Sequence, residues 1–161
     1  MPRFWRPRDS RGVALGGSEH RWCLRPDRVT ASGVGALRYF FWVTDLGFVA
    51  YWLVTLSGIL PDEYLFKDYH EPVLVAWNWS FLPLDLLISA TGLASLFAHR
   101  RAHLLWRPLA LLSLALTSCS GLMAISFWVL RRDFDPSWWI PNLYLLVYPL
   151  FFLPRLMRGP D

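Results

Sequence analysis

Four long apolar runs, separated by short polar links, constrain most strongly what this chain can fold into. They cover about residues 37–60, 73–97, 108–130 and 138–157 of the 161. A helix of roughly 20 apolar residues crosses the hydrocarbon core of a bilayer, and each run is about that long. Hydrophobic residues make up 55% of the chain and are gathered into these runs. The pattern predicts an all-α integral membrane protein, a four-helix bundle, and not a soluble globule.

The charges in the links predict how the bundle is oriented. Eight arginines occur by Arg38 and three more between the second and third runs, whereas the first link has no arginine and only one lysine, Lys67. The positive-inside rule then places both termini in the cytoplasm, and an even number of spans is consistent with that. The net charge of +4 is carried almost wholly by arginine. We interpret it as attraction to an anionic membrane face, not to nucleic acid, and the arginine bias as a sign of a GC-rich bacterial genome.

Residues 1–35 differ from the remainder of the chain. They are polar and rich in arginine, glycine, proline and serine, so they cannot bury a core, and we expect a disordered cytoplasmic tail. The tail is either a plain leader or a polybasic arm that binds lipid. Residues 36–158 then form one transmembrane domain.

The second run carries a seam of polar and small residues on one helical face. Its members follow one another at spacings of four and three: Asn78, Leu82, Asp85, Ser89, Gly92, Leu96 and His99. An acid at that depth is tolerated only where it faces protein or trapped water. The seam must therefore pack against partner helices. We also expect Pro83 to kink this helix.

Two acids inside apolar runs, Asp45 and Asp85, are the strongest candidates for chemistry. No lysine or arginine occurs at matching depth, so burial favours their protonated forms, which can donate hydrogen bonds. Thr44, Tyr51, Asn78 and Ser89 are candidate partners. Two interpretations remain open: a proton relay, acid–base pair or ligand pocket, and a polar clamp that fixes helix register.

Aromatic residues gather near the predicted outer face. Trp77, Trp79, Trp138 and Trp139 are either interfacial anchors or an aromatic ligand cage. Asn142 lies in the same region, directly after Pro141. We expect no cofactor and no metal, because His99 and His103 lack a third ligand at their depth, and Cys23 and Cys119 match no metal spacing.

Three motifs resemble a known family. They are Phe41–Phe48 (FWVTDLGF), Ala76–Asp85 (AWNWSFLPLD) and Trp138–Tyr144 (WWIPNLY). They are similar to the YvaD-like group of small bacterial integral membrane proteins, over about Leu37 to Pro154. The resemblance implies a four-span membrane protein of uncharacterised function, and it brings no substrate, cofactor or catalytic residue.

The leading functional hypothesis is a non-enzymatic binding or accessory protein of the bacterial plasma membrane. Its polar pocket would open towards the outer leaflet, with Pro83 and Pro141 supplying backbone groups. Two alternatives stay open: a proton-coupled carrier of small solutes using Asp45 and Asp85, and a membrane enzyme acting on a lipid-like substrate. The expected partners are the lipid bilayer and, as alternatives, a second copy of the chain or another membrane subunit.

Overall fold

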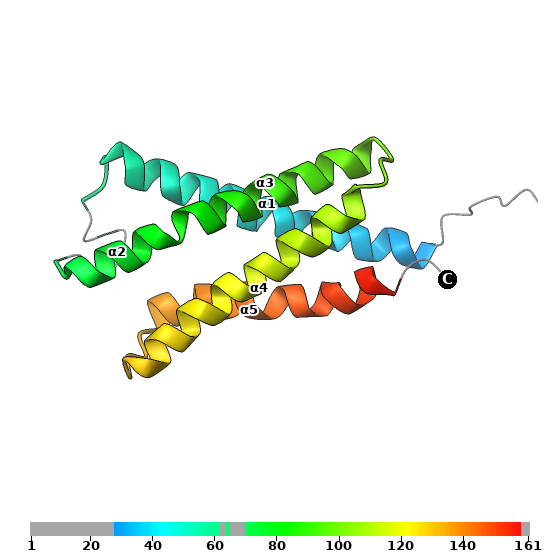
Figure 1. The fold of residues 1–161 in the computed structure, drawn as a ribbon. Coiled ribbons are helices and arrows are strands. Elements are labelled where there is room, and N and C mark those ends of the chain that lie inside the picture. Colours follow the sequence, from blue (N-terminus) through cyan, green and yellow to red (C-terminus); the bar gives the residue numbers. More distant parts are fainter. Residues whose placement is uncertain (1–27, 62–63, 65–69, 159–161) are drawn as a thin grey trace, which may run out of the picture.

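A computed structural model describes residues 28–61, 64 and 70–158, and it confirms the predicted all-α fold. The helices are α1 (Arg28–Ser57), α2 (Pro72–Ser80), α3 (Leu82–Arg100), α4 (Trp106–Leu130) and α5 (Pro136–Met157) (Figure 1). The expected disorder of Met1–Asp27, and most of the acidic link after α1, lie outside the described residues. Helix α1 begins at Arg28, earlier than predicted, so the last residues assigned to the tail are helical.

The burial pattern is inverted relative to that of a soluble protein. Among the described residues, four helical segments are long and apolar enough to cross a membrane: Gly35–Ser57, Pro72–Arg100, Trp106–Leu130 and Pro136–Met157. Large apolar side chains such as Leu53, Leu86 and Phe151 are exposed, while Asp45, Asn78 and other polar side chains are buried. Soluble monomers rarely expose apolar surface on this scale, so the distribution is typical of a multi-pass membrane protein.

The second membrane segment is interrupted at Phe81, as expected from Pro83. Proline has no N–H to donate to the carbonyl one turn earlier, and its ring clashes there. The helix therefore divides into α2 and α3, and the N–H of Phe81 turns to the carbonyl of Asn78 at 3.1 Å. The regular ladder resumes where the N–H of Asp85 donates to the carbonyl of Phe81 at 2.8 Å.

Small residues allow the helices to approach closely, as is usual in lipid. Helix α4 packs along both α3 and α5, and α1 packs on α3. At Gly121 of α4 an added Cβ would lie 2.5 Å from the backbone nitrogen of Leu146 and 2.7 Å from the carbonyl oxygen of Asn142. The hydroxyl of Ser118, nearby on α4, donates to the carbonyl of Leu146. Helices α4 and α5 therefore touch backbone to backbone.

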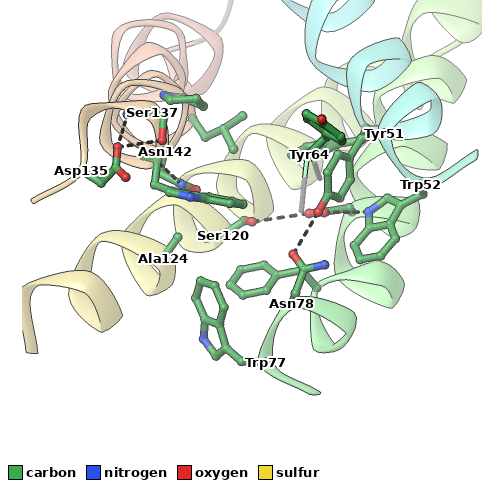
Figure 2. A pocket seen from close by; sticks show the side chains of 16 residues that line it. Tyr51, Trp52, Tyr64, Trp77, Asn78, Ser120, Ala124, Asp135, Ser137 and Asn142 are labelled. Atoms are coloured by element: carbon green, nitrogen blue, oxygen red, sulfur yellow. Dashed lines mark hydrogen bonds between the residues drawn. The ribbon is translucent and has the colours of Figure 1, made fainter. Parts of the chain in front are cut away.

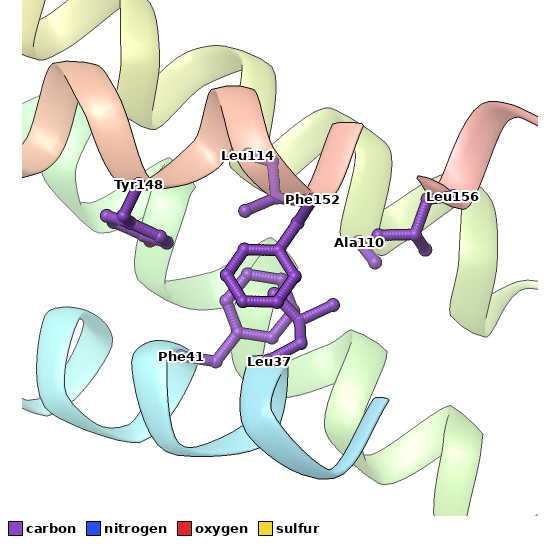
Figure 3. Close-up of a cluster of buried hydrophobic side chains, with 7 residues drawn as sticks. All are labelled: Leu37, Phe41, Ala110, Leu114, Tyr148, Phe152 and Leu156. Atoms are coloured by element: carbon purple, nitrogen blue, oxygen red, sulfur yellow. The ribbon is translucent and has the colours of Figure 1, made fainter. Parts of the chain in front are cut away.

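Helices α1 and α5 meet at one end of the bundle. A cluster of buried apolar side chains joins α1, α4 and α5 there: Leu37, Phe41, Ala110, Leu114, Tyr148, Phe152 and Leu156 (Figure 3). At the same end the guanidinium of Arg107 donates to the carbonyl of Leu156, which satisfies a free acceptor at the last turn of α5. At the other end, the start of α5 lies well away from the end of α1 (Figure 1). The candidate site lies at the end where α1 and α5 diverge.

Candidate functional site

A cavity of about 630 Å³ lies between the diverging ends of α1 and α5. Its lining comes from α1, α2, α3, α4, α5 and the links between them: Phe48, Tyr51, Trp52, Tyr64, Trp77, Asn78, Phe81, Asp85, Ser120, Ala124, Asp135, Ser137, Trp138, Pro141, Asn142 and Leu145 (Figure 2). Aromatic rings make up much of this wall, and a few polar groups are placed between them. Small-molecule sites commonly combine a largely apolar wall with a few convergent polar groups.

Asp85 is the acid of this cavity. It occupies the first turn of α3, and only 4% of its surface is exposed. The indole N–H of Trp52 on α1 donates to its Oδ2 at 3.0 Å, and the hydroxyl of Ser120 on α4 reaches its Oδ1 at 3.5 Å. Three helices therefore hold this carboxyl group in place.

Asn78 stands one helical segment earlier and is also buried. Its Oδ1 accepts a hydrogen bond of 3.1 Å from the hydroxyl of Tyr51 (Figure 2). Its amide nitrogen has no hydrogen-bond partner among the described residues. A buried donor without a partner costs about 1–3 kcal/mol, so Asn78 is the least satisfied polar group of the cavity wall.

An aromatic surface joins α2, α4 and α5 beside the cavity. Trp77 stacks on Phe127, with ring centroids 4.2 Å apart, and makes an edge contact with Trp128 at 5.6 Å. Trp128 in turn stacks on Trp138 at 5.9 Å. Trp77 and Trp138 both line the cavity, so the buried Trp128 supports both of its flanking walls.

The α5 side of the cavity includes Asp135, which caps the start of this helix, and Pro141 within it. Asp135 caps the helix, because its Oδ1 accepts from the backbone N–H of Ser137 at 3.0 Å and from its hydroxyl at 2.7 Å. One turn on, the amide nitrogen of Asn142 donates to the carbonyl of Trp138 at 2.7 Å. That bond directs the Asn142 side chain back along its own helix beside Pro141.

A second polar cluster lies deeper and does not line the cavity. Asp45 is 0% exposed, and neither of its carboxyl oxygens has a hydrogen-bond partner among the described residues. The hydroxyl of Ser89 donates to its backbone carbonyl at 3.2 Å, and its carboxyl group rests against Gly92. Gly92 lies about 10 Å along α3 from Asp85, so the two acids occupy different levels of the bundle. Thr44 belongs to this deeper region, where its hydroxyl lies 3.2 Å from that of Tyr144.

Comparisons with known proteins agree on one family. A family described as "Family of unknown function (DUF5360)" matches residues 37–160. A Bacillus subtilis (strain 168) protein, "Uncharacterized protein YvaD", is 51% identical over 122 residues, which are 76% of this chain and 92% of that protein. The chain belongs to this family. The YvaD-like resemblance inferred from the three sequence motifs is thereby confirmed. No solved structure matches the chain.

All the cavity residues fall inside the matched family region, but they are only part of the predicted site. Asp85, Asn78, Trp77 and Asn142 line the cavity. The other four lie elsewhere: Asp45, Thr44 and Ser89 in the deeper cluster, and Trp79 on the exposed side of α2 with its ring 5.6 Å from Trp52.

The remaining candidates from the sequence are two prolines and two histidines. Pro83 is exposed and does not line the cavity, whereas Pro141 does. The ring of His99 packs edge-on against Trp106, and Nδ1 of His103 accepts from the backbone N–H of Leu105 at 3.2 Å. Both histidines therefore help to form the short link between α3 and α4.

Trp52 is one of the cavity residues that sequence reasoning missed. It follows Asp45 by two helical turns, and the positions Phe41, Asp45, Phe48, Trp52 and Thr55 repeat at the same spacing of four and three that marks the seam on α3. Reading that stripe on α1 would have found Trp52.

Proposed function

We propose that this chain is a non-catalytic binding protein of the bacterial plasma membrane, and that the cavity beside Asp85 holds a small molecule. The observation that carries the proposal is the cavity itself. Its volume of about 630 Å³ lies within the range of roughly 300–1,000 Å³ typical of ligand sites. Asp85, Asn78 and Ser120 converge on it from three helices.

The placement of the polar groups supports a ligand site over a simple clamp. A clamp that fixes register needs polar groups that satisfy one another, as Asp85 and Trp52 do. Asn78 still has a buried, unpartnered amide nitrogen at the cavity wall. A ligand that accepts a hydrogen bond there would remove this cost.

The proposal is tested by what the protein retains during purification. The full chain is purified in a mild detergent, and small molecules released on denaturation are identified by mass spectrometry. The matched pair of variants is Ala124→Leu, which adds methyl groups inside the cavity, and Ala115→Leu, which adds them on the exposed face of the same helix. A molecule retained by the wild type and by Ala115→Leu, but lost from Ala124→Leu, supports the proposal.

Two results would contradict it. Either no small molecule is retained, or the same molecule is retained equally by all three proteins. Thermal unfolding in the same detergent shows whether Ala124→Leu is folded. If it is not, Ser120→Val fills the same wall with a smaller change of volume.

One observation favours a second function, a proton-coupled carrier. The carboxyl group of Asp45 is fully buried, and among the described residues it has no hydrogen-bond partner. Carboxyl groups at bilayer depth mark proton pathways in transporters. Four spans enclose little volume, so a carrier of this size would work as a dimer. Vesicle uptake that is driven by a pH gradient and abolished by both Asp45→Asn and Asp85→Asn would favour it, whereas uptake that ignores the gradient would exclude it.

A further inference from the structure

We infer that the occupant of the cavity is an organic cation, an ammonium compound whose charge sits between the Asp85 carboxylate and the aromatic wall. This inference rests on the proposed binding function and names its ligand class. The ammonium group has two sources in a membrane: a free amine, and the headgroup of a zwitterionic lipid. The chemistry of the site is the same for both.

The charges around the cavity favour a cation. Asp85 and Asp135 are both in its lining, and none of the described residues that line it is lysine, arginine or histidine. Arg131 is not in the lining, and its guanidinium lies 5.9 Å from the ring centres of Phe127 and Trp128. Among the described lining residues no basic side chain offers a partner to an anionic ligand, whereas Asp85 offers one to a cation.

The Asp85 carboxyl group already accepts hydrogen bonds from two neighbouring helices. The indole N–H of Trp52 donates to it at 3.0 Å, and the hydroxyl of Ser120 is placed to do the same. Hydrogen bonds to a carboxylate stabilise its ionised form. A cation beside it would provide the opposite charge that a buried carboxylate requires.

The walls suit the same ligand. Tyr51, Trp52, Trp77 and Trp138 all line the cavity, and tryptophan and tyrosine are the rings that attract cations most strongly through their faces. Recognition of quaternary ammonium groups commonly combines several such rings. An apolar wall of leucine and valine would have served a neutral apolar ligand equally well.

The unpartnered amide of Asn78 adds one more feature. It is a donor, it is buried, and its own residue lines the cavity two helical turns before Asp85 in the chain. A ligand with an acceptor oxygen near its ammonium group would satisfy it. The expected ligand is therefore an ammonium group with a neighbouring hydroxyl, ether or ester oxygen.

The experiment compares two probes of the same shape. Choline carries a trimethylammonium group and a hydroxyl, and neohexyl alcohol replaces the trimethylammonium with an uncharged tert-butyl group. Both are titrated by calorimetry into the full chain in a maltoside detergent, whose headgroup carries no ammonium. We expect choline to bind about tenfold or more tightly than neohexyl alcohol, because cation–π attraction and the carboxylate act only on the charge.

Two variants locate the binding. Asp85→Asn keeps the shape and removes the charge, and we expect it to weaken choline binding about tenfold or more while it leaves neohexyl alcohol unchanged. Asp45→Asn is the matched control, because Asp45 is equally buried and does not line the cavity. If Asp85→Asn does not fold, Trp77→Leu tests the aromatic wall in its place, with the same preferential loss of choline.

The outcomes separate the inference from the proposed function. If both probes bind equally, the cation inference fails and the binding function stands. If choline does not bind, or if Asp45→Asn weakens it as much as Asp85→Asn does, the inference fails, and retention of a co-purified molecule decides the function separately. If phosphatidylethanolamine displaces choline and phosphatidylglycerol does not, the site binds a lipid headgroup. If neither lipid displaces choline, the site binds a free amine.

Discussion

At the scale of single residues, the contact between Asp45 and Gly92 sets how closely α1 approaches α3. A Cβ on Gly92 would lie 2.0 Å from Oδ2 of Asp45, so only glycine leaves room for this carboxyl group. We predict that Gly92→Ala destabilises the protein by about 1–3 kcal/mol, as overpacking in a core usually does. Thermal unfolding in detergent measures the loss.

The control and the rescue for this prediction lie on the same helix, α1. Gly47→Ala is the control, since a Cβ there meets nothing within 4 Å. Removing the carboxyl group should restore the fit, so Asp45→Ala combined with Gly92→Ala is expected to cost less than the sum of the two single changes. Additive losses would show that the two side chains do not compete for this space.

The hydrogen bonds of Asp85 allow a prediction about folding stability. Trp52 can only donate a hydrogen bond, while the hydroxyl of Ser120 can donate or accept. In Asp85→Asn the new carbonyl oxygen can take the Trp52 bond, and the new amide can donate to Ser120. We therefore predict that Asp85→Asn folds with a loss of about 1 kcal/mol or less, whereas Asp85→Leu leaves the buried indole N–H unpaired and loses about 1–3 kcal/mol. Equal losses in thermal unfolding would contradict this.

At the scale of helices, α3 and α4 end in the same way, with a residue other than glycine in the left-handed conformation. Ala102 follows α3 with a φ of 51°, and Arg132 follows α4 with a φ of 57°. At both ends the N–H of the left-handed residue and the N–H of the residue after it donate to carbonyls of the last helical turn. For example, the N–H of His103 donates to the carbonyl of Ala98 at 2.9 Å. This is the Schellman arrangement, in which glycine is the favoured residue because it has no Cβ to clash.

We predict that Ala102→Gly stabilises the protein by about 1 kcal/mol, because it relieves the left-handed strain without removing a contact. The matched variant is Ala90→Gly, an exposed alanine within α3, where the same change should destabilise by about 1 kcal/mol. Thermal unfolding of the two variants should therefore move in opposite directions. A loss at both positions would mean that this end of α3 is not held as described.

The helices and their buried faces could be predicted, because lipid leaves few alternatives. Backbone groups must be satisfied within each span, so long apolar runs become helices, and Pro83 must interrupt one of them. On the seam along α2 and α3, Asn78, Asp85, Ser89 and Gly92 are buried as expected, while His99 is exposed. A polar residue beyond the last apolar turn can reach water, so the seam ends before it.

At the scale of the whole molecule, the division of the polar residues between the cavity and the deeper cluster could not be predicted. The sequence placed Asp45 and Asp85 in one interior, but it carries no signal for the crossing of α1 and α5. The apolar cluster around Phe41 and Phe152 holds these helices together at one end. At the other end both helices contribute side chains to the lining of the cavity. Crossing depends on how ridges of side chains fit between helices far apart in the chain. Two acids that look equivalent in the sequence thus have different surroundings.

The orientation of the whole bundle decides which side of the membrane can supply the cavity. Arg100, Arg101 and Arg107 lie in or directly beside the link between α3 and α4, and this link is at the end opposite the cavity. The positive-inside rule predicts that this link is cytoplasmic and that the cavity opens outwards. In a chain whose Cys23 and Cys119 are replaced by serine, we introduce one cysteine at a time, by Ile59→Cys or Leu104→Cys.

Both positions suit a membrane-impermeant maleimide added to whole cells. Ile59 follows α1 at the cavity end and is 78% exposed, and Leu104 lies in the arginine-rich link and is 89% exposed. We expect labelling of Ile59→Cys in intact cells and of Leu104→Cys only after the cells are opened. Because the rule acts on charge, replacing the three arginines of the link by glutamine should weaken this preference. The reverse labelling pattern would make the cavity a cytoplasmic site, and its ligand would then have to come from inside the cell.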